Sequence, residues 1–274
     1  MPPVPPQLHF PSPYERPSTP PEVARRIRMA DGALIAAFVY GAQGSGDDVL
    51  FLHGNGEEHG IFGPAIDACV DAGHRVVAID SRGQGKSTRG NERISYELMT
   101  DDAIAVLDAL CIQQVHVVGF SDGGIEALLL ARDHPERVVS ILAIGANLTP
   151  DGVLEEPDWN LAENVGILRE WAAYDGFGED VDPALLSPTP DEAATTADLL
   201  ELMLLEPHIS AESLERISCP VTVMVGEFDC IRDDETVAIW RAIPGAQLAV
   251  VPGCGHSIPK RAPEALTWAL VQQL

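Results

Sequence analysis

The chain has 274 residues, of which 46% are hydrophobic, and its formal net charge is −25 with only two lysines, Lys86 and Lys260. A chain of this size can bury one large core, so we expect a single α/β domain that carries an insertion. So negative a surface repels nucleic acid and anionic membranes, which excludes both as partners.

Further features of the composition concern the cellular compartment. No apolar run is long enough to span a bilayer, and the first residues are rich in proline where a signal peptide would carry basic and apolar residues. The number of cysteines is odd and their spacing is not paired, which favours reduced thiols over a disulfide framework. We therefore expect a cytoplasmic protein with free thiols at Cys69, Cys111, Cys219, Cys230 and Cys254.

The chain begins with a proline-rich segment, residues 1–22, which shows little apolar periodicity. Such a composition favours an extended arm that lies across the surface. Residues 23–29 and 33–40 then flank Asp31 and Gly32, a pair typical of the tight turn in a β-hairpin.

From residue 48 onward, short apolar runs alternate with helical patterns. Repeated strand–helix units of this kind form a mostly parallel sheet with helices on both faces, here of eight strands when the hairpin is included. Ser95 is the expected N-cap of one helix. The expected strands are 48–52, 74–79, 115–118, 138–144, 221–225 and 247–251, and the expected helices are 61–72, 95–110, 125–131 and a last one from 263.

The rhythm of strands and helices is interrupted at residues 146–210, which are helical in pattern and include no expected strand. This segment is predicted to be an inserted helical cap, so that the core consists of residues 23–145 and 211–274. Of its aromatic side chains, we expect Trp159 and Trp171 to contact substrate and the others to pack between cap helices. The aromatic residues of the segment are Trp159, Trp171, Tyr174 and Phe177.

The most informative motif is Gly119–Gly124, which follows the strand 115–118 and precedes an apolar helical run. A strand, a glycine-flanked serine and a helix together present the Ser121 hydroxyl for attack on a carbonyl group. Gly119 and Gly123 stand where side chains would collide in so sharp a turn, and Ser121 is expected to adopt a strained backbone conformation. The alternative is a glycine-rich turn in which a serine or aspartate only caps a helix.

Two further residues complete a candidate catalytic triad. Asp229 follows the strand 221–225, and His256 follows the strand 247–251. Since ligands bind beyond the carboxyl ends of parallel strands, both side chains are expected close to Ser121. His256 would take the proton from Ser121 while Asp229 orients the imidazole. Asp233 and Asp234 are less favoured acids because they lie further from the strand end and suit the start of the next helix.

An acyl-transfer site also needs donors for the developing oxyanion. One is the backbone N–H of Asp122, directly after the nucleophile. The other is expected from the loop His53–Gly56, where Asn55 N–H is the first choice and Gly56 N–H the second.

Polar residues of the N-terminal half raise two other possibilities, a phosphate-binding loop and a metal site. The segment 80–87 is glycine-rich but lacks the spacing of a phosphate-binding loop, so Asp80 and Arg82 are expected to tie it beneath the site. No recognised ligand spacing relates the nearby histidines and glutamates, so no metal site is predicted. These residues are His53, His59, Glu57 and Glu58.

The combined motifs resemble those of the α/β-hydrolase superfamily, in particular its capped serine hydrolases, over nearly the whole chain after residue 22. The order Ser121, Asp229, His256 matches that of the superfamily. The resemblance implies the α/β-hydrolase fold and a serine hydrolase that cleaves small carboxylic esters through an acyl-enzyme. It also implies that no cofactor or metal is needed and that the partner is a small-molecule ester. The matching motifs are His53–Gly56, Asp80–Ser87 (D-x-R-G-x-G-x-S), Gly119–Gly124 and Gly253–Ser257.

The resemblance narrows the reaction without fixing the substrate. A serine at 121 argues against the haloalkane dehalogenase and epoxide hydrolase branches, which use aspartate there. The elbow is similar to that of valacyclovir-hydrolase-like enzymes, which implies that Asp122 receives a substrate ammonium. The alternative is that Asp122 only stabilises the N-terminus of a helix. A lactonase, a carbon–carbon bond hydrolase and a non-catalytic ligand-binding protein of the same fold remain alternatives.

Overall fold

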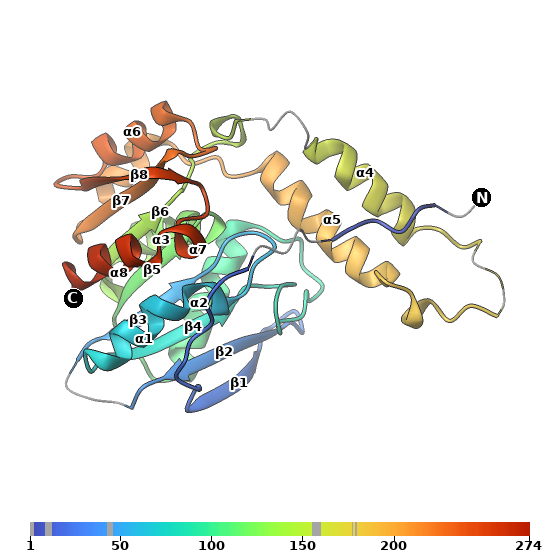
Figure 1. Ribbon diagram of the computed structural model, residues 1–274, viewed down its shortest axis with the longest axis horizontal. Helices are drawn as coiled ribbons and strands as arrows, with labels where there is room; N and C mark the ends of the chain where they lie inside the picture. Colours follow the sequence, from blue (N-terminus) through green and yellow to red (C-terminus); the bar gives the residue numbers. More distant parts are fainter. Residues whose placement is uncertain (1–2, 9–12, 43–45, 155–159, 177, 179) are drawn as a thin grey trace.

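The computed structural model describes residues 3–8, 13–42, 46–154, 160–176, 178 and 180–274 (Figure 1). None of the helices within these ranges is long and apolar enough to cross a membrane. The described chain forms one twisted sheet with helices on both faces, from which a pair of helices projects.

The sheet has eight strands within the described residues, in the order β1-β2-β4-β3-β5-β6-β7-β8. The hairpin β1–β2 pairs antiparallel and β2 joins β4 antiparallel, while the strands from β4 to β8 are parallel. This confirms the predicted α/β fold class. The strands are β1 Val23–Arg28, β2 Leu34–Tyr40, β3 Asp48–Leu52, β4 Arg75–Asp80, β5 Val115–Phe120, β6 Val138–Ile144, β7 Val221–Phe228 and β8 Gln247–Gly255.

The helices cover the sheet on both faces. Helices α2, α3 and α6 pack with one set of strand side chains, and α1, α7 and α8 pack with the other. Alternation along β3 shows why, because Leu50 and Leu52 belong to the first core and Val49 and Phe51 to the second. The helices are α1 Gly63–Asp71, α2 Tyr96–Ala109, α3 Asp122–Asp133, α4 Leu161–Ala172, α5 Pro190–Leu205, α6 Asp233–Ala242, α7 Ile258–Arg261 and α8 Pro263–Val271.

Local sequence signals account for most of these boundaries. Ser95 caps α2 as predicted, since its hydroxyl accepts a hydrogen bond from Leu98 N–H at 3.1 Å. Strands β7 and β8 run further than predicted because their backbones stay paired as far as Phe228 and Gly255. A Cβ at Gly226 would lie 2.3 Å from Gly255 O, so only glycine allows this approach. The longer pair brings the ends of both strands together.

Residues 146–210 contain α4 and α5, short 3-10 turns and no strand within the described part of the segment. The two helices pack against each other around a small core of their own: Leu168, Trp171, Ala193 and Ala197. A capping box of Thr189 and Glu192 begins α5. In Figure 1 the pair extends away from the sheet, with one end of α5 close to the core.

The proline-rich N-terminal arm contacts both parts of the molecule. Tyr14 OH donates a hydrogen bond to Glu58 at 2.5 Å, and the backbone N–H groups of Ser18 and Thr19 donate to Asp67 at 2.8 and 3.1 Å. Leu8 packs against the small core between α4 and α5. The described parts of the arm therefore lie in extended form on the surface.

Candidate active site

The turn between β5 and α3 has the geometry of a nucleophile elbow. Ser121 has φ 55° and ψ −117°, a left-handed conformation that costs a non-glycine residue roughly 1–3 kcal/mol. A Cβ at Gly119 would lie 2.0 Å from Gly123 O, and a Cβ at Gly123 would lie 2.1 Å from Leu52 O. The turn therefore requires glycine at both positions and lifts the serine hydroxyl away from the backbone.

The structure brings Ser121, His256 and Asp229 together from the ends of β5, β8 and β7. His256 Nε2 lies 3.0 Å from Ser121 Oγ, and His256 Nδ1 lies 2.7 Å from Asp229 Oδ1. Asp229 also accepts hydrogen bonds from Ile231 N–H and Gly226 N–H, at 3.0 and 3.3 Å. With Nδ1–H donated to the carboxylate, Nε2 has its lone pair free to accept the serine proton.

The electrostatics of the pair favour a charged interaction between imidazole and carboxylate. Burial lowers the pKa of His256, but its interactions with Asp229 and Cys230 outweigh burial, and the net pKa is raised. Burial also opposes ionisation of Asp229, yet the hydrogen bond from His256 lowers the pKa of that carboxyl overall. The less favoured acids, Asp233 and Asp234, lie in the first turn of α6, where their charge suits the helix dipole.

Two backbone N–H groups beside Ser121 are available to a ligand. Asp122 is the first residue of α3, so its N–H belongs to the donors that have no partner within the helix. Within the described residues, neither this N–H nor that of Asn55 donates a hydrogen bond. Gly56, the second choice from the sequence, differs because its N–H donates to Gln84 Oε1 at 2.6 Å. A Cβ at Gly54 would lie 2.8 Å from Ser121 Cβ, which shows how closely this loop approaches the nucleophile.

The Asp122 side chain is buried, with 3% of its surface exposed. Its carboxylate accepts hydrogen bonds from Tyr96 OH at 2.9 Å and from Asn55 Nδ2 at 3.0 Å. Burial raises the pKa of Asp122 to about 6, despite these two bonds. Because both oxygens are engaged and shielded, this carboxylate serves the protein's own polar groups.

Tyr96 and Gln84, which were not predicted from the sequence, also contact residues of this site. Gln84 lies within the D-x-R-G-x-G-x-S segment, at a position that the motif leaves variable. Its place inside this motif is the sequence signal that could have indicated a role near the site. Nothing local to Tyr96 in the sequence connects it to Asp122, since the two residues are 26 positions apart.

The segment 80–87 is held beneath the site by buried ion pairs. Arg82 is fully buried and donates to Asp102 at 2.9 and 2.8 Å and to Asp31 at 2.5 Å. Asp80 accepts from His59 and from the backbone N–H of Lys86, at 2.7 and 2.8 Å. The segment thus connects the sheet, the hairpin and α2.

Among the described residues, two groups of side chains lie close enough together to share a metal ion by distance alone. In the first, Glu58, His59 and Asp80, the donor atoms already bind the protein: Glu58 pairs with Arg16 and Tyr14, and His59 Nε2 lies 3.0 Å from Tyr40 OH. The second group combines Asp229 and His256 with Cys230, and its imidazole already lies between the carboxylate and Ser121. Neither donor set is vacant for a metal.

Of the two tryptophans expected to contact substrate, Trp159 lies outside the described residues, as does Phe177. Trp171 is buried to 3% exposure between α4 and α5, and its Nε1–H donates to Pro188 O at 2.9 Å. This is the position expected of an aromatic side chain that packs between cap helices.

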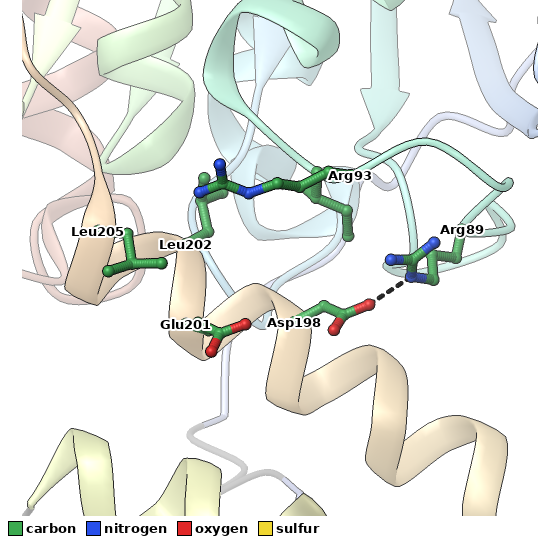
Figure 2. A pocket seen from close by; sticks show the side chains of 7 residues that line it. Arg89, Arg93, Asp198, Glu201, Leu202 and Leu205 are labelled. Carbon is green, nitrogen blue, oxygen red and sulfur yellow. Dashed lines mark hydrogen bonds and ion pairs between the residues drawn. The ribbon is translucent and has the colours of Figure 1, made fainter.

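Figure 2 shows a small cavity between α5 and the loop of residues 89–94. Its volume of about 40 Å³ suits about one water molecule and is far too small for an ester. Arg89 pairs with Asp198, which also accepts from Arg169 at 2.5 Å. The ion pair between Arg89 and Asp198 attaches α5 to the loop of residues 89–94. The lining residues are Arg89, Arg93, Ile94, Asp198, Glu201, Leu202 and Leu205.

Comparison of the sequence and the fold with known proteins finds hydrolases in each case. The family profile described as alpha/beta hydrolase fold matches residues 48–203, more than half of the chain. A putative carbamate hydrolase RutD of Caulobacter sp. (strain K31) is 29% identical, with 82% of this chain and 90% of the relative covered. A 2-hydroxy-6-oxononadienedioate/2-hydroxy-6-oxononatrienedioate hydrolase of Pseudomonas sp is 33% identical, with 84% and 89% covered. The solved esterase EaEST from Exiguobacterium antarcticum is 25% identical, with a TM-score of 0.70 and 91% and 98% covered.

Proposed function

This chain belongs to the α/β-hydrolase fold family, and we propose that it hydrolyses small, uncharged carboxylic esters through an acyl-enzyme on Ser121. The observation that carries the proposal is the chain of contacts from Ser121 Oγ through His256 to Asp229, at 3.0 and 2.7 Å. These distances fit a nucleophile, a general base and the group that orients the base.

In the first step, His256 Nε2 takes the proton of Ser121 as Oγ attacks the ester carbonyl carbon. Asp229 holds the imidazole in the tautomer that leaves Nε2 free and stabilises the imidazolium that forms. The N–H groups of Asn55 and Asp122 donate to the oxyanion, and each such donor is worth roughly 2.7–4 kcal/mol of barrier. His256 then returns the proton to the leaving alcohol. In the second half of the reaction, His256 takes a proton from water as the water attacks the acyl-enzyme, and it returns that proton to Ser121 Oγ as the acid leaves.

The charges near the site favour an uncharged substrate over the dicarboxylate in the name of the Pseudomonas relative. The cations beside the cap are already paired: Arg89 with Asp198, and Arg93 with Glu206 at 3.4 Å. Lys260 pairs with Glu57 at 2.5 Å. A dianionic ligand would have to compete for these cations against the protein's own carboxylates and a net charge of −25.

The buried Asp122 carboxylate argues against amino-acid esters. An ammonium group would have to displace the hydrogen bonds from Tyr96 and Asn55 and reach a side chain with 3% exposure. The valacyclovir-hydrolase-like specificity implied by the elbow motif is therefore not part of the proposal.

The decisive experiment labels the protein with a fluorophosphonate and measures turnover of p-nitrophenyl acetate and butyrate. We expect stoichiometric labelling at Ser121, and we expect Ser121→Ala to remove both labelling and turnover. Unchanged ester hydrolysis in pure Ser121→Ala protein would overturn the proposal. Capture of an ester without turnover by unmodified protein would favour the ligand-binding alternative.

A matched pair of substrates tests the charge argument. Dimethyl succinate and monomethyl succinate differ by one ionised carboxylate but have nearly the same size. We expect kcat/KM to be at least about tenfold higher for the diester, because each like-charge repulsion raises the barrier to binding. Faster turnover of the monoester would contradict the charge argument. Faster turnover of a vinylogous diketone dicarboxylate would instead favour the carbon–carbon hydrolase, and preference for a simple lactone would favour a lactonase.

A further inference from the structure

The Asn55 carboxamide connects three segments that are distant in the sequence. Its Nδ2 donates to Asp122 Oδ2 at the elbow and to Leu199 O in the cap helix α5, both at 3.0 Å. Asn55 itself belongs to the loop that supplies a proposed oxyanion donor. One side-chain amide therefore touches the elbow, the oxyanion loop and the cap.

The other partner of this amide is a carboxylate in an unusual setting. Asp122 is buried and lies between Asn55 Nδ2 and Tyr96 OH, which donates from the first turn of α2. One helical turn along α3, Glu126 is 1% exposed and its Oε1 has no hydrogen-bond partner in the described structure. A buried carboxylate without hydrogen-bond partners is costly, and Asp122, unlike Glu126 Oε1, has a donor for each of its oxygens.

We propose that Asp122 and Asn55 act as a positioning pair, in which the ionised Asp122 carboxylate holds the Asn55 amide so that the oxyanion loop and the cap helix are both set against the nucleophile elbow. The inference rests on the proposed ester hydrolase, because the donor that it positions is the Asn55 N–H. Neither side chain is assigned a contact with substrate.

The bond geometry explains why ionisation matters. An ionised carboxylate accepts from Asn55 and Tyr96 at the same time, and bonds to a charged acceptor are roughly twice as strong as neutral ones. Protonation places an O–H on one oxygen, so one of the two donors loses its acceptor or must reorient. Since the Asn55 side chain and its backbone N–H share one residue, the loop is then less firmly held.

Titration of Asp122 falls in an accessible range, because burial raises its pKa to about 6. The ionisable groups that face it are Tyr96 from α2, Glu126 from α3 and His256 from the end of β8. The charge of His256 favours the ionised Asp122 carboxylate, whereas burial and the charges of Asp122 and Asp102 raise the pKa of Glu126. Although burial opposes ionisation of Asp229, the hydrogen bond from His256 lowers the pKa of that carboxyl, so it titrates at lower pH than Asp122.

This leads to a pH signature that a purely structural role would not produce. Above pH 6, log kcat/KM should rise with slope one as His256 loses its proton. Below pH 6, protonation of Asp122 adds a second loss of about tenfold, so the slope should steepen to about 1.5 between pH 6 and 5 and return toward one at lower pH. In Asp122→Asn we expect about a tenfold lower kcat, a KM within about twofold and a slope that stays at one.

Two further variants complete the set. Asp102→Asn is the matched control, because Asp102 is a buried carboxyl whose pKa is raised to about 6 but whose bonds go to Arg82. It should retain the second slope. Asn55→Ala should resemble Asp122→Asn, and the double variant should be no worse than either single one, because both remove the same connection.

The same variants are followed by hydrogen exchange in peptides that cover residues 53–58 and 195–203, corrected for intrinsic rates. Exchange there should accelerate in wild type below pH 6 and in Asp122→Asn at every pH, but not in Asp102→Asn. This readout needs no catalysis, so absence of ester turnover in wild type would refute the proposed function alone. A second slope that persists in Asp122→Asn, multiplicative losses in the double variant, or unchanged exchange in both peptides would overturn the positioning pair.

Discussion

Replacing Gly145 by alanine should displace His256, the proposed general base, while leaving the fold intact. Gly145 follows β6 with φ +59°, and a Cβ there would lie 2.8 Å from His256 Cε1 and 3.0 Å from Nδ1. The first distance is about 0.6 Å short of the 3.4 Å at which ordinary contact begins. The imidazole must therefore move away from its present hydrogen bonds with Ser121 and Asp229.

The expected magnitude has two parts. Alanine in a left-handed conformation costs roughly 1–2 kcal/mol of stability, and a catalytic group misplaced by about 1 Å costs up to about 100-fold in rate. A displacement of about 0.6 Å should therefore lower kcat by roughly 10- to 100-fold. Gly245→Ala is a matched control, because Gly245 has φ +75° and no atom within 4 Å of an added Cβ.

The assay compares the two variants in p-nitrophenyl butyrate turnover, in the rate of fluorophosphonate labelling and in thermal unfolding. We expect both to lose similar stability and only Gly145→Ala to lose activity. If Gly145→Ala keeps the activity of Gly245→Ala, His256 does not depend on the space that Gly145 leaves, and the reasoning is refuted.

Three further predictions concern charged groups. Asp229→Asn should lower kcat roughly 10⁴-fold, with native far-UV circular dichroism, because the imidazole loses the partner that fixes its tautomer; an activity near wild type would redirect attention to Asp233 or Asp234. Since Asp229 raises the pKa of His256 and only the neutral imidazole accepts a proton, kcat/KM should still rise with pH above 6.5, and a profile that is already level at pH 6.5 would contradict this. Glu126→Met should raise the free energy of unfolding by about 1–3 kcal/mol, because it removes a buried oxygen without a partner. Burial raises the pKa of Glu126, so its folded state binds the proton more tightly than the unfolded state and stability falls as pH rises; the gain in urea unfolding should therefore be larger at pH 8 than at pH 5.

Much of the architecture was accessible from the chain because its signals are local. Short continuous apolar runs indicate the parallel strands, and the strand Asp48–Leu52 has the same bounds in the sequence prediction and the structure. Gly119 is required by a contact with Gly123 inside the turn itself, so the glycine spacing already indicates the elbow, whereas the approach of Leu52 from β3 to Gly123 is a long-range contact. The ends of β7 and β8 were predicted too early, because the extra pairing depends on the close approach of two backbones that are distant in the chain.

The contacts of the candidate site also divide into those that local sequence signals predict and those that depend on long-range packing. Ser121, Asp229 and His256 each follow the end of a strand. They therefore lie at the carboxyl edge of the sheet, a position that hydrophobic periodicity and the topology of parallel sheets already predict. That Gly56 donates to Gln84 was not predictable, since the contact spans 28 positions and depends on how two loops fold over one another. Burial of Trp171 likewise depends on the pairing of α4 with α5.

The sequence by itself determined the alternation of strands and helices, the serine elbow and the order of the three proposed catalytic residues, because short-range sterics and hydrophobic periodicity suffice for these features. Only the tertiary structure decided what the carboxylate of Asp122 does. Its two partners, Tyr96 and Asn55, come from other segments, and its 3% exposure follows from their packing. A side chain at a helix N-terminus is equally compatible with a substrate contact and an internal hydrogen bond, and long-range packing alone selects between them.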